Sequence, residues 1–141
     1  MRLIELDPEF IRWEDRVETR QRVAPGFDTG SEDGFRQWVA AGNPTVPFTG
    51  PVTCLLQVQA LPDAQGVEFD CPKCRDHRIH IAFAGRGVAD HHGTHASDGR
   101  PTRWRVTGTG FDDITLAPSV DCTPSNPNCW HGFITNGEIT P

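Results

Sequence analysis

The sequence VEFDCPKC at residues 67–74, together with CWHGF at residues 129–133, decides the fold predicted for this chain. The first segment places two thiols at C-x2-C spacing, and the second places a thiol and an imidazole at C-x-H spacing. Thiolates and imidazoles are ligands that zinc prefers, and a structural zinc takes four of them in a tetrahedron. The sequence therefore predicts one Zn²⁺ ion that joins the two segments through Cys71, Cys74, Cys129 and His131.

The spacing inside each segment suits this arrangement. A C-x2-C turn lets two thiolates converge, Pro72 restrains the backbone of that turn, and Lys73 offsets the negative charge. Residues i and i+2 of an extended segment project from the same side, so Cys129 and His131 are expected to reach one ion together. Four protein ligands leave no position for water or substrate, which indicates a structural site rather than a catalytic one.

Two other ligand sets fit the same segments. Cys122 is able to replace one of the two ligands in the second segment. Residues 71–80 also contain a local C-x2-C-x2-H-x2-H set, which would use His77 and His80. Strand alternation places these two histidines on opposite faces, so the distant set is favoured over the local one.

Length and composition argue against several classes of protein. The 141 residues correspond to one domain with a modest core. The net charge of -6 argues against a nucleic-acid partner, because phosphate binding requires a basic face. No apolar run approaches the roughly 20 residues that span a bilayer, and residues 1–5 do not begin a signal peptide. We expect no membrane contact, synthesis in the host cytoplasm, and cysteines that serve metal binding rather than disulfides.

The predicted fold is mostly β (small α+β). We expect an antiparallel sheet of about five to seven strands pinned by the zinc site, with one or two short helices near the N-terminus. Residues 1–50 are predicted to form an N-terminal arm with a short helix, and residues 51–141 a zinc-binding β domain. Strands are predicted from alternation and from turn residues at 52–60, 67–70, 75–83, 102–108, 112–120, 130–134 and 138–140. Asn136-Gly137 predicts a type I′ hairpin between the last two.

The first 24 residues give a mixed signal. Asp7, Pro8 and Glu9 form a helix-start pattern. Arginines crowd the segment that follows, so a short strand followed by either a helix or an extended arm is expected here. Three prolines mark residues 43–51 as a loop.

A short helix is predicted between Ser31, as its N-cap, and Gly42, as its C-terminal stop. Phe35, Trp38 and Val39 share one face of this helix. We expect that face to pack on the core, and docking of a partner protein is the alternative.

A second group of imidazoles lies in a segment without periodicity, where His91, His92 and His95 are accompanied by Asp90 and Asp98. A flexible polar loop is the expected state of such a segment. The alternative is an open metal site, which would make the protein a zinc-dependent hydrolase of peptidase or amidase type. The chain contains no H-E-x-x-H, no G-x-S-x-G and no phosphate-binding loop.

Four motifs occur together in the second half of the chain: FDCPxC at 69–74, Trp104, ITLxPSV at 114–120 and CWHGFIxNGE at 129–138. Their combination resembles a family of small uncharacterised bacterial and bacteriophage proteins that are predicted zinc binders. Some members have been labelled ammonia monooxygenase, and more distant relatives occur beside bacterial ubiquitin-like conjugation genes. The resemblance implies no known reaction. It implies metal ligands at Cys71, Cys74, Cys129 and His131, and fold roles for Pro118-Ser119 and Asn136-Gly137.

A closed metal site and this resemblance predict a non-enzymatic, zinc-stabilised structural or interaction protein. We expect it to be phage-encoded and associated with the virion, as a tail or head accessory component whose partners are other protein subunits. A host-directed protein-binding module is the alternative that keeps the same chemistry.

Overall fold

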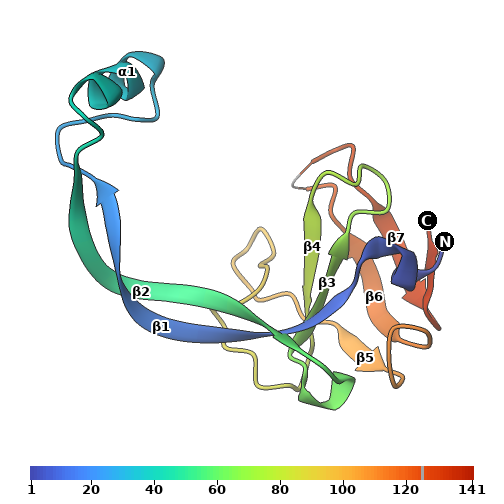
Figure 1. The fold of residues 1–141 in the computed structure, drawn as a ribbon. Coiled ribbons are helices and arrows are strands. Elements are labelled where there is room, and N and C mark those ends of the chain that lie inside the picture. Colours follow the sequence, from blue (N-terminus) through green and yellow to red (C-terminus); the bar gives the residue numbers. More distant parts are fainter. Residues whose placement is uncertain (125) are drawn as a thin grey trace. The chain divides into compact units, whose positions relative to one another are not determined.

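The computed structural model describes residues 1–124 and 126–141. These residues form two compact units, one made of residues 1–14 and 55–141 and the other of residues 15–54. Their elements, labelled in Figure 1 where there is room, are the 3₁₀-helix η1 (Leu3–Leu6), β1 (Glu9–Val23), α1 (Glu32–Ala40), β2 (Thr45–Val58), the 3₁₀-helix η2 (Leu61–Asp63), β3 (Gly66–Asp70), β4 (Arg78–Ala82), β5 (Arg105–Thr107), β6 (Thr115–Asp121), β7 (His131–Thr135) and β8 (Glu138–Thr140).

The structure confirms the mostly β prediction, with α1 as the α-helix of the described residues. The strands form two four-stranded sheets instead of the single sheet expected, in the orders β2-β1-β3-β4 and β5-β6-β7-β8. The hairpin signal is also confirmed, because Asn136 and Gly137 both have positive φ, at 50° and 76°. The predicted boundary at residues 50 and 51 stays a prediction.

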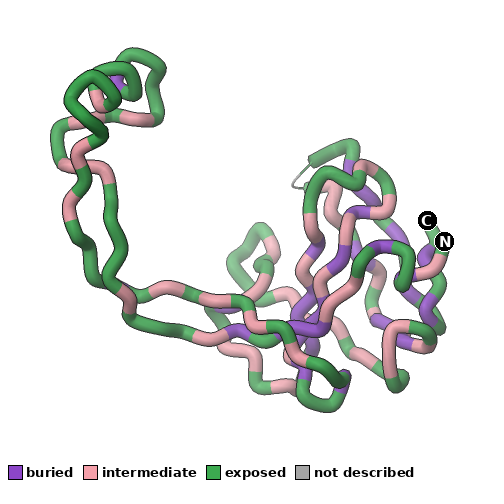
Figure 2. The backbone as a smooth tube through the Cα atoms, in the orientation of Figure 1, coloured by how far each residue is buried: buried purple, intermediate pink, exposed green. Residues whose placement is uncertain are grey.

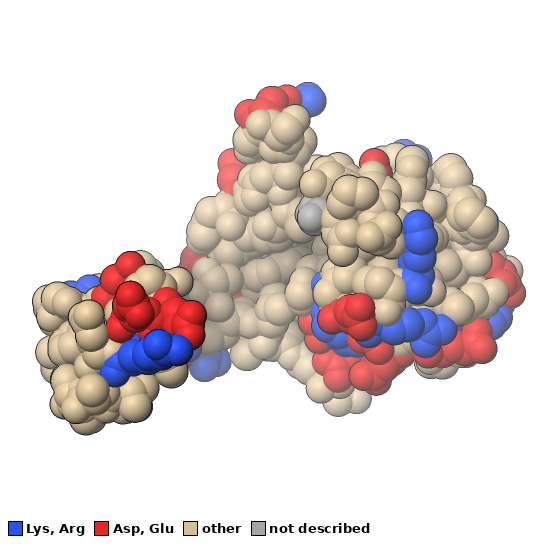
Figure 3. Space-filling model, turned by 90° about the horizontal axis from the view of Figure 1, so that it is seen from above, with Lys and Arg blue, Asp and Glu red and all other residues tan. Residues whose placement is uncertain are grey.

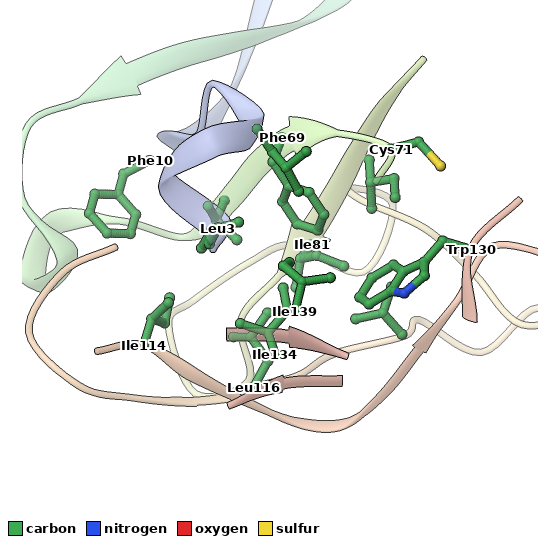
Figure 4. Packing of buried hydrophobic residues seen from close by; sticks show 14 of the residues in the cluster. Leu3, Phe10, Phe69, Cys71, Ile81, Ile114, Leu116, Trp130, Ile134 and Ile139 are labelled. Atoms are coloured by element: carbon green, nitrogen blue, oxygen red, sulfur yellow. The ribbon is translucent and has the colours of Figure 1, made fainter. Parts of the chain in front are cut away.

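The core lies between the two sheets of the larger unit. In β3 and β4, Phe69, Ile79 and Ile81 are buried, and in β7 only Gly132 and Ile134 are. Figure 4 shows these apolar side chains converging from both sheets, with Trp130 at one side. The buried cluster consists of Leu3, Leu6, Phe10, Leu61, Ala64, Val67, Phe69, Cys71, Ile79, Ile81, Phe83, Ile114, Leu116, Val120, Cys129, Trp130, Ile134 and Ile139.

Of the two alternatives expected after Asp7, the structure shows the extended segment and not the helix, because β1 begins at Glu9. Asp7 has a φ of 51°, which turns the chain, and Glu9, Phe10 and Ile11 then pair with β3. That pairing buries Phe10 and Ile11, an energetic gain that outweighs a local capping preference. The predicted loop at residues 43–51 is strand β2 from Thr45 onward, since prolines are tolerated in an edge strand.

Residues 15–54 contain α1, whose N-cap is confirmed. The Ser31 hydroxyl accepts a hydrogen bond from the Gly34 N–H at 3.1 Å. The expectation that the apolar face of α1 packs on the core is wrong, because Phe35 is 49% exposed and Val39 46% exposed. Figure 2 shows buried positions gathered in the larger unit, whereas residues 15–54 are mostly exposed or half-buried.

Charged side chains of both signs lie beside one another on the face shown in Figure 3. The larger unit contains several ion pairs. Arg78 contacts Glu68 at 3.2 Å and Asp70 at 3.2 Å, and His80 contacts Glu68 at 2.9 Å. Among the described residues, no helix combines the length and apolar character that crossing a membrane requires.

Candidate active site and metal centre

A bulge in β6 presents Ser119 to β7. Leu116 pairs with Ile134 and Val120 pairs with Gly132, so three residues of β6 lie opposite one residue of β7. A bulge of this kind re-aims the side chains it contains. Gly132 also permits a close approach of β7 to β8, because a Cβ at this position would lie 1.9 Å from the Thr140 carbonyl oxygen.

Ser119 and His131 meet across the two strands. The Ser119 Oγ lies 3.3 Å from the His131 Nε2. The serine is half-buried and the histidine is exposed. The Trp104 indole N–H donates to the Ser119 carbonyl at 3.2 Å, which ties the bulge to the segment before β5. A hydroxyl within hydrogen-bond reach of an imidazole is the arrangement that activates a serine as a nucleophile.

Asp121 places a negative charge beside this pair. It lies directly opposite His131 in the β6–β7 ladder. Hydrogen bonds from the Thr123 hydroxyl and the Thr123 N–H, together with the charge of His131, lower the pKa of Asp121. Its carboxylate is therefore ionised at neutral pH.

Ser119 opens onto a groove of about 900 Å³. β4, residues 94–104 and the second half of β6 provide its walls. This volume falls within the range of about 300 to 1,000 Å³ that is usual for ligand sites. A serine that lines such a groove, with an imidazole in reach of its hydroxyl, is able to attack a bound substrate.

The cysteines of the two predicted segments gather beside the same groove, since His77 and Cys122 also line it. The Cys71 and Cys129 sulfurs are 3.7 Å apart and both residues are buried. His77 joins them, because its Nδ1 is 3.1 Å from the Cys74 sulfur and its Nε2 is 3.1 Å from the Cys129 sulfur. The donor atoms of Cys71, Cys74 and His77 all lie within 4.8 Å of one another, which is close enough to hold one metal ion.

Electrostatics at this cluster favour a bound cation. Burial opposes ionisation of the Cys71 thiol, but backbone N–H groups of Cys74, Lys73 and Trp130 outweigh it and lower the pKa of Cys71 to about 6. Burial and the neighbouring Cys71 thiol raise the pKa of Cys129. Burial and the charge of Cys129 likewise raise the pKa of Cys122 to about 12. Ionisation of one thiol therefore opposes ionisation of its neighbours, and a bound metal ion would offset that repulsion.

The spacing of the sulfurs also fits zinc. Two sulfurs that each lie about 2.3 Å from a tetrahedral zinc are about 3.8 Å apart. The separation of 3.7 Å between Cys71 and Cys129 agrees with that geometry. The chemistry of the donors agrees as well, since three thiols and an imidazole form a usual structural zinc site.

The structure brings together three of the four predicted ligands and directs the fourth elsewhere. Cys71, Cys74 and Cys129 lie in the cluster, whereas His131 contacts Ser119. The expectation that Cys129 and His131 project together assumed an extended segment, but β7 begins only at His131. His77 occupies the place beside the sulfurs. The predicted ligand set that includes His131 is tested below.

The imidazoles of the loop at residues 91–95 have other neighbours. His92 is 7% exposed and stacks on Trp13 with ring centroids 6.3 Å apart. The His95 Nε2 lies 2.6 Å from the Asp90 carbonyl oxygen. His80, the other histidine of the local ligand set, pairs with Glu68.

The pairing of Ser119 with His131 was not expected from the sequence, where the resemblance implied a fold role for Pro118-Ser119. No G-x-S-x-G motif surrounds Ser119, and His131 lies 12 positions further along the chain. The sequence contained only a weak signal for this pair. Ser119 and His131 both lie in the set of motifs that carries the resemblance.

Comparison with known proteins gives the class of chemistry. Residues 53–141, more than half of the chain, match the model of a family described as bacterial ubiquitination-like system serine protease (BubE). No curated protein and no solved structure matches the chain.

This match corrects several predictions. The expected non-enzymatic, virion-associated phage protein is wrong, and so is the uncharacterised zinc-binder family as the assigned relative. The peptidase class of the alternative agrees with the match, although the family is one of serine proteases rather than zinc-dependent hydrolases. The chain belongs to the BubE family, the serine proteases of bacterial ubiquitination-like systems.

Proposed function

We propose that this chain is a serine peptidase in which Ser119 is the nucleophile and His131 is the general base. The observation that carries the proposal is the 3.3 Å separation of the Ser119 Oγ and the His131 Nε2 beside the groove. The family supports the same chemistry, and its description makes a polypeptide of a ubiquitination-like system the expected substrate.

The reaction follows from this geometry. His131 accepts the hydroxyl proton while the Ser119 oxygen attacks the scissile carbonyl carbon. The peptide C–N bond then breaks, and the leaving amine takes the proton from His131. A water molecule hydrolyses the acyl ester by the same steps in the second half of the cycle. Asp121 favours the positively charged His131 that forms in both halves.

The sulfur cluster adjoins this site, because His77 and Cys122 line the same groove as Ser119. We assign the metal, most simply zinc, to Cys71, Cys74, Cys129 and His77, with Cys122 next to Cys129 as the remaining thiol. When bound, the metal supplies a cross-link and no reacting group. Cys129 lies two residues before His131, so the cross-link fixes the start of the strand that carries the base.

Labelling with a fluorophosphonate tests the assignment of the nucleophile. The reagent should form a bond between its phosphorus and the Ser119 oxygen with loss of fluoride, and intact-mass and peptide mass spectrometry should locate one adduct at Ser119. Ser119→Ala should abolish labelling. Ser97→Ala is the matched control, because Ser97 lines the same groove, and it should still be labelled. An adduct at another residue, or labelling that survives in Ser119→Ala, would overturn the proposal.

A further inference from the structure

β4 is the last strand of its sheet, and its outer edge forms one wall of the groove at Ser119. In an antiparallel pair, successive residues direct their N–H and C=O groups alternately toward the partner strand and away from it. The His77 carbonyl accepts from the Cys71 N–H at 2.9 Å, and the Phe83 N–H donates to the Gln65 carbonyl at 2.8 Å. Odd-numbered residues therefore face β3, and the backbone groups of Arg78, His80 and Ala82 point to the outer edge.

Trp104 ends this edge at the level of the nucleophile. Its N–H donates to the Ala82 carbonyl at 2.9 Å, and its carbonyl accepts from the Ala84 N–H at 2.8 Å. It thus forms a one-residue parallel bridge with Phe83. The same residue donates its indole N–H to the Ser119 carbonyl. Within residues 1–124 and 126–141, no strand pairs with the edge on the other side of this bridge, along Arg78 and His80.

The side chains along this edge are engaged with their own sheet. Arg78 is paired with Glu68 and Asp70, and His80 is paired with Glu68. Because these charged side chains are already paired, the edge presents backbone N–H and C=O groups to the groove rather than unpaired charge. A row of such groups is a template for an added extended strand.

We propose that the substrate binds as an extended polypeptide segment that adds a strand to the outer edge of β4, with its scissile bond at Ser119. This inference rests on the proposed function and specifies its substrate, which is an unfolded stretch or terminus rather than the surface of a folded protein. Recognition is through the backbone at Arg78 and His80, and Trp104 sets the register by blocking the edge beyond Ala82.

A series of peptide phosphonates tests this binding mode. Acetyl-trialanyl diphenyl phosphonate should form a bond between its phosphorus and the Ser119 oxygen, with loss of phenol. Each amide of the probe is then N-methylated in turn, and the second-order rate of adduct formation is measured by intact-mass spectrometry. Amides that face β4 should lose about tenfold in rate and the amide that faces away less than twofold, because only alternate amides of a strand pair with a neighbour.

Hydrogen exchange gives a second measurement on the same protein. Backbone amides of residues 78–82 should exchange more slowly in the trialanyl adduct than in the adduct formed by a fluorophosphonate, which carries no peptide. Labelling of Ser119 by both reagents, with equal N-methyl effects at every amide and equal exchange, would overturn the binding mode alone. Failure of both reagents to label Ser119 would overturn the proposed function together with it.

Discussion

Cys129 and His131 are two residues apart and belong to sites of opposite character. Cys129 is 2% exposed and packs among sulfurs, whereas His131 is exposed and faces a serine beside an open groove. The difference arises because β7 begins at His131, so Cys129 lies before the strand and His131 lies in it. One short segment therefore carries a residue of the proposed metal anchor and the proposed base, and the start of β7 separates the two.

The largest effect is expected from breaking the anchor. Cys71→Ser should remove the thiol that ionises first and abolish metal binding. The free energy of unfolding should fall by at least about 3 kcal/mol, since a structural metal contributes directly to folding. Metal analysis and thermal unfolding followed by circular dichroism measure the change. Cys54→Ser, at a half-buried cysteine outside the cluster, is the control, and a folded, metal-free Cys71→Ser protein would contradict the expectation.

Removing the base should silence the second site without disturbing the first. His131→Ala should slow the phosphonylation of Ser119 by about a thousandfold, as the loss of a catalytic base usually does. The metal content should stay unchanged, because the His131 imidazole contacts Ser119 and not the sulfurs. Loss of the metal from this variant would restore the ligand set predicted from the sequence.

His77→Ala is expected to have the reverse effect. The imidazole bridges the Cys74 and Cys129 sulfurs, so its removal should weaken metal affinity by about 10- to 100-fold. Competition with a chromophoric chelator measures this change. Ser119 labelling at saturating metal should fall much less than in His131→Ala. The two histidine variants together assign His77 to the metal site and His131 to the serine. Equal losses of metal in both variants would contradict this assignment.

The contrast between these histidines also shows what the sequence could and could not predict. Alternation predicted strand β4, because Ile79 and Ile81 repeat at the period of a strand and are buried. The C-x2-C spacing brought Cys71 and Cys74 together because four residues are enough to close a turn. The position of His131 depended on where β7 starts, and that boundary is set by pairing with Val120 and Asp121. Ser119 depended on a bulge, which leaves no periodic signal in the sequence.

Acid should release the metal as the Cys71 thiolate is protonated. Backbone N–H groups lower the pKa of Cys71 to about 6, so its thiolate is present above that pH and is lost as the pH falls through it. A group with a lowered pKa stabilises the folded state above its ordinary pKa and loses that contribution during acidification. The fall of metal affinity on acidification should therefore steepen below pH 6, where Cys71 adds about tenfold for each pH unit. No steepening near pH 6 would indicate that the Cys71 thiolate does not hold the ion.

The smallest effect concerns the residue that connects the groove to the nucleophile. Trp104→Phe keeps the aromatic ring and the backbone bridge to Phe83 but removes the indole N–H that holds the Ser119 carbonyl. One hydrogen bond of this kind is worth about 0.5 to 1.5 kcal/mol, so Ser119 phosphonylation should slow by roughly 3- to 10-fold.

Metal content should not change in this variant, because Trp104 contacts no residue of the sulfur cluster through its indole N–H. Trp38→Phe is the matched control, since the Trp38 indole donates to the Pro44 carbonyl within residues 15–54. Equal rates in Trp104→Phe and the unmodified chain would show that the bulge holds Ser119 without help. A rate loss shared by both variants would show that the effect is not specific to the nucleophile.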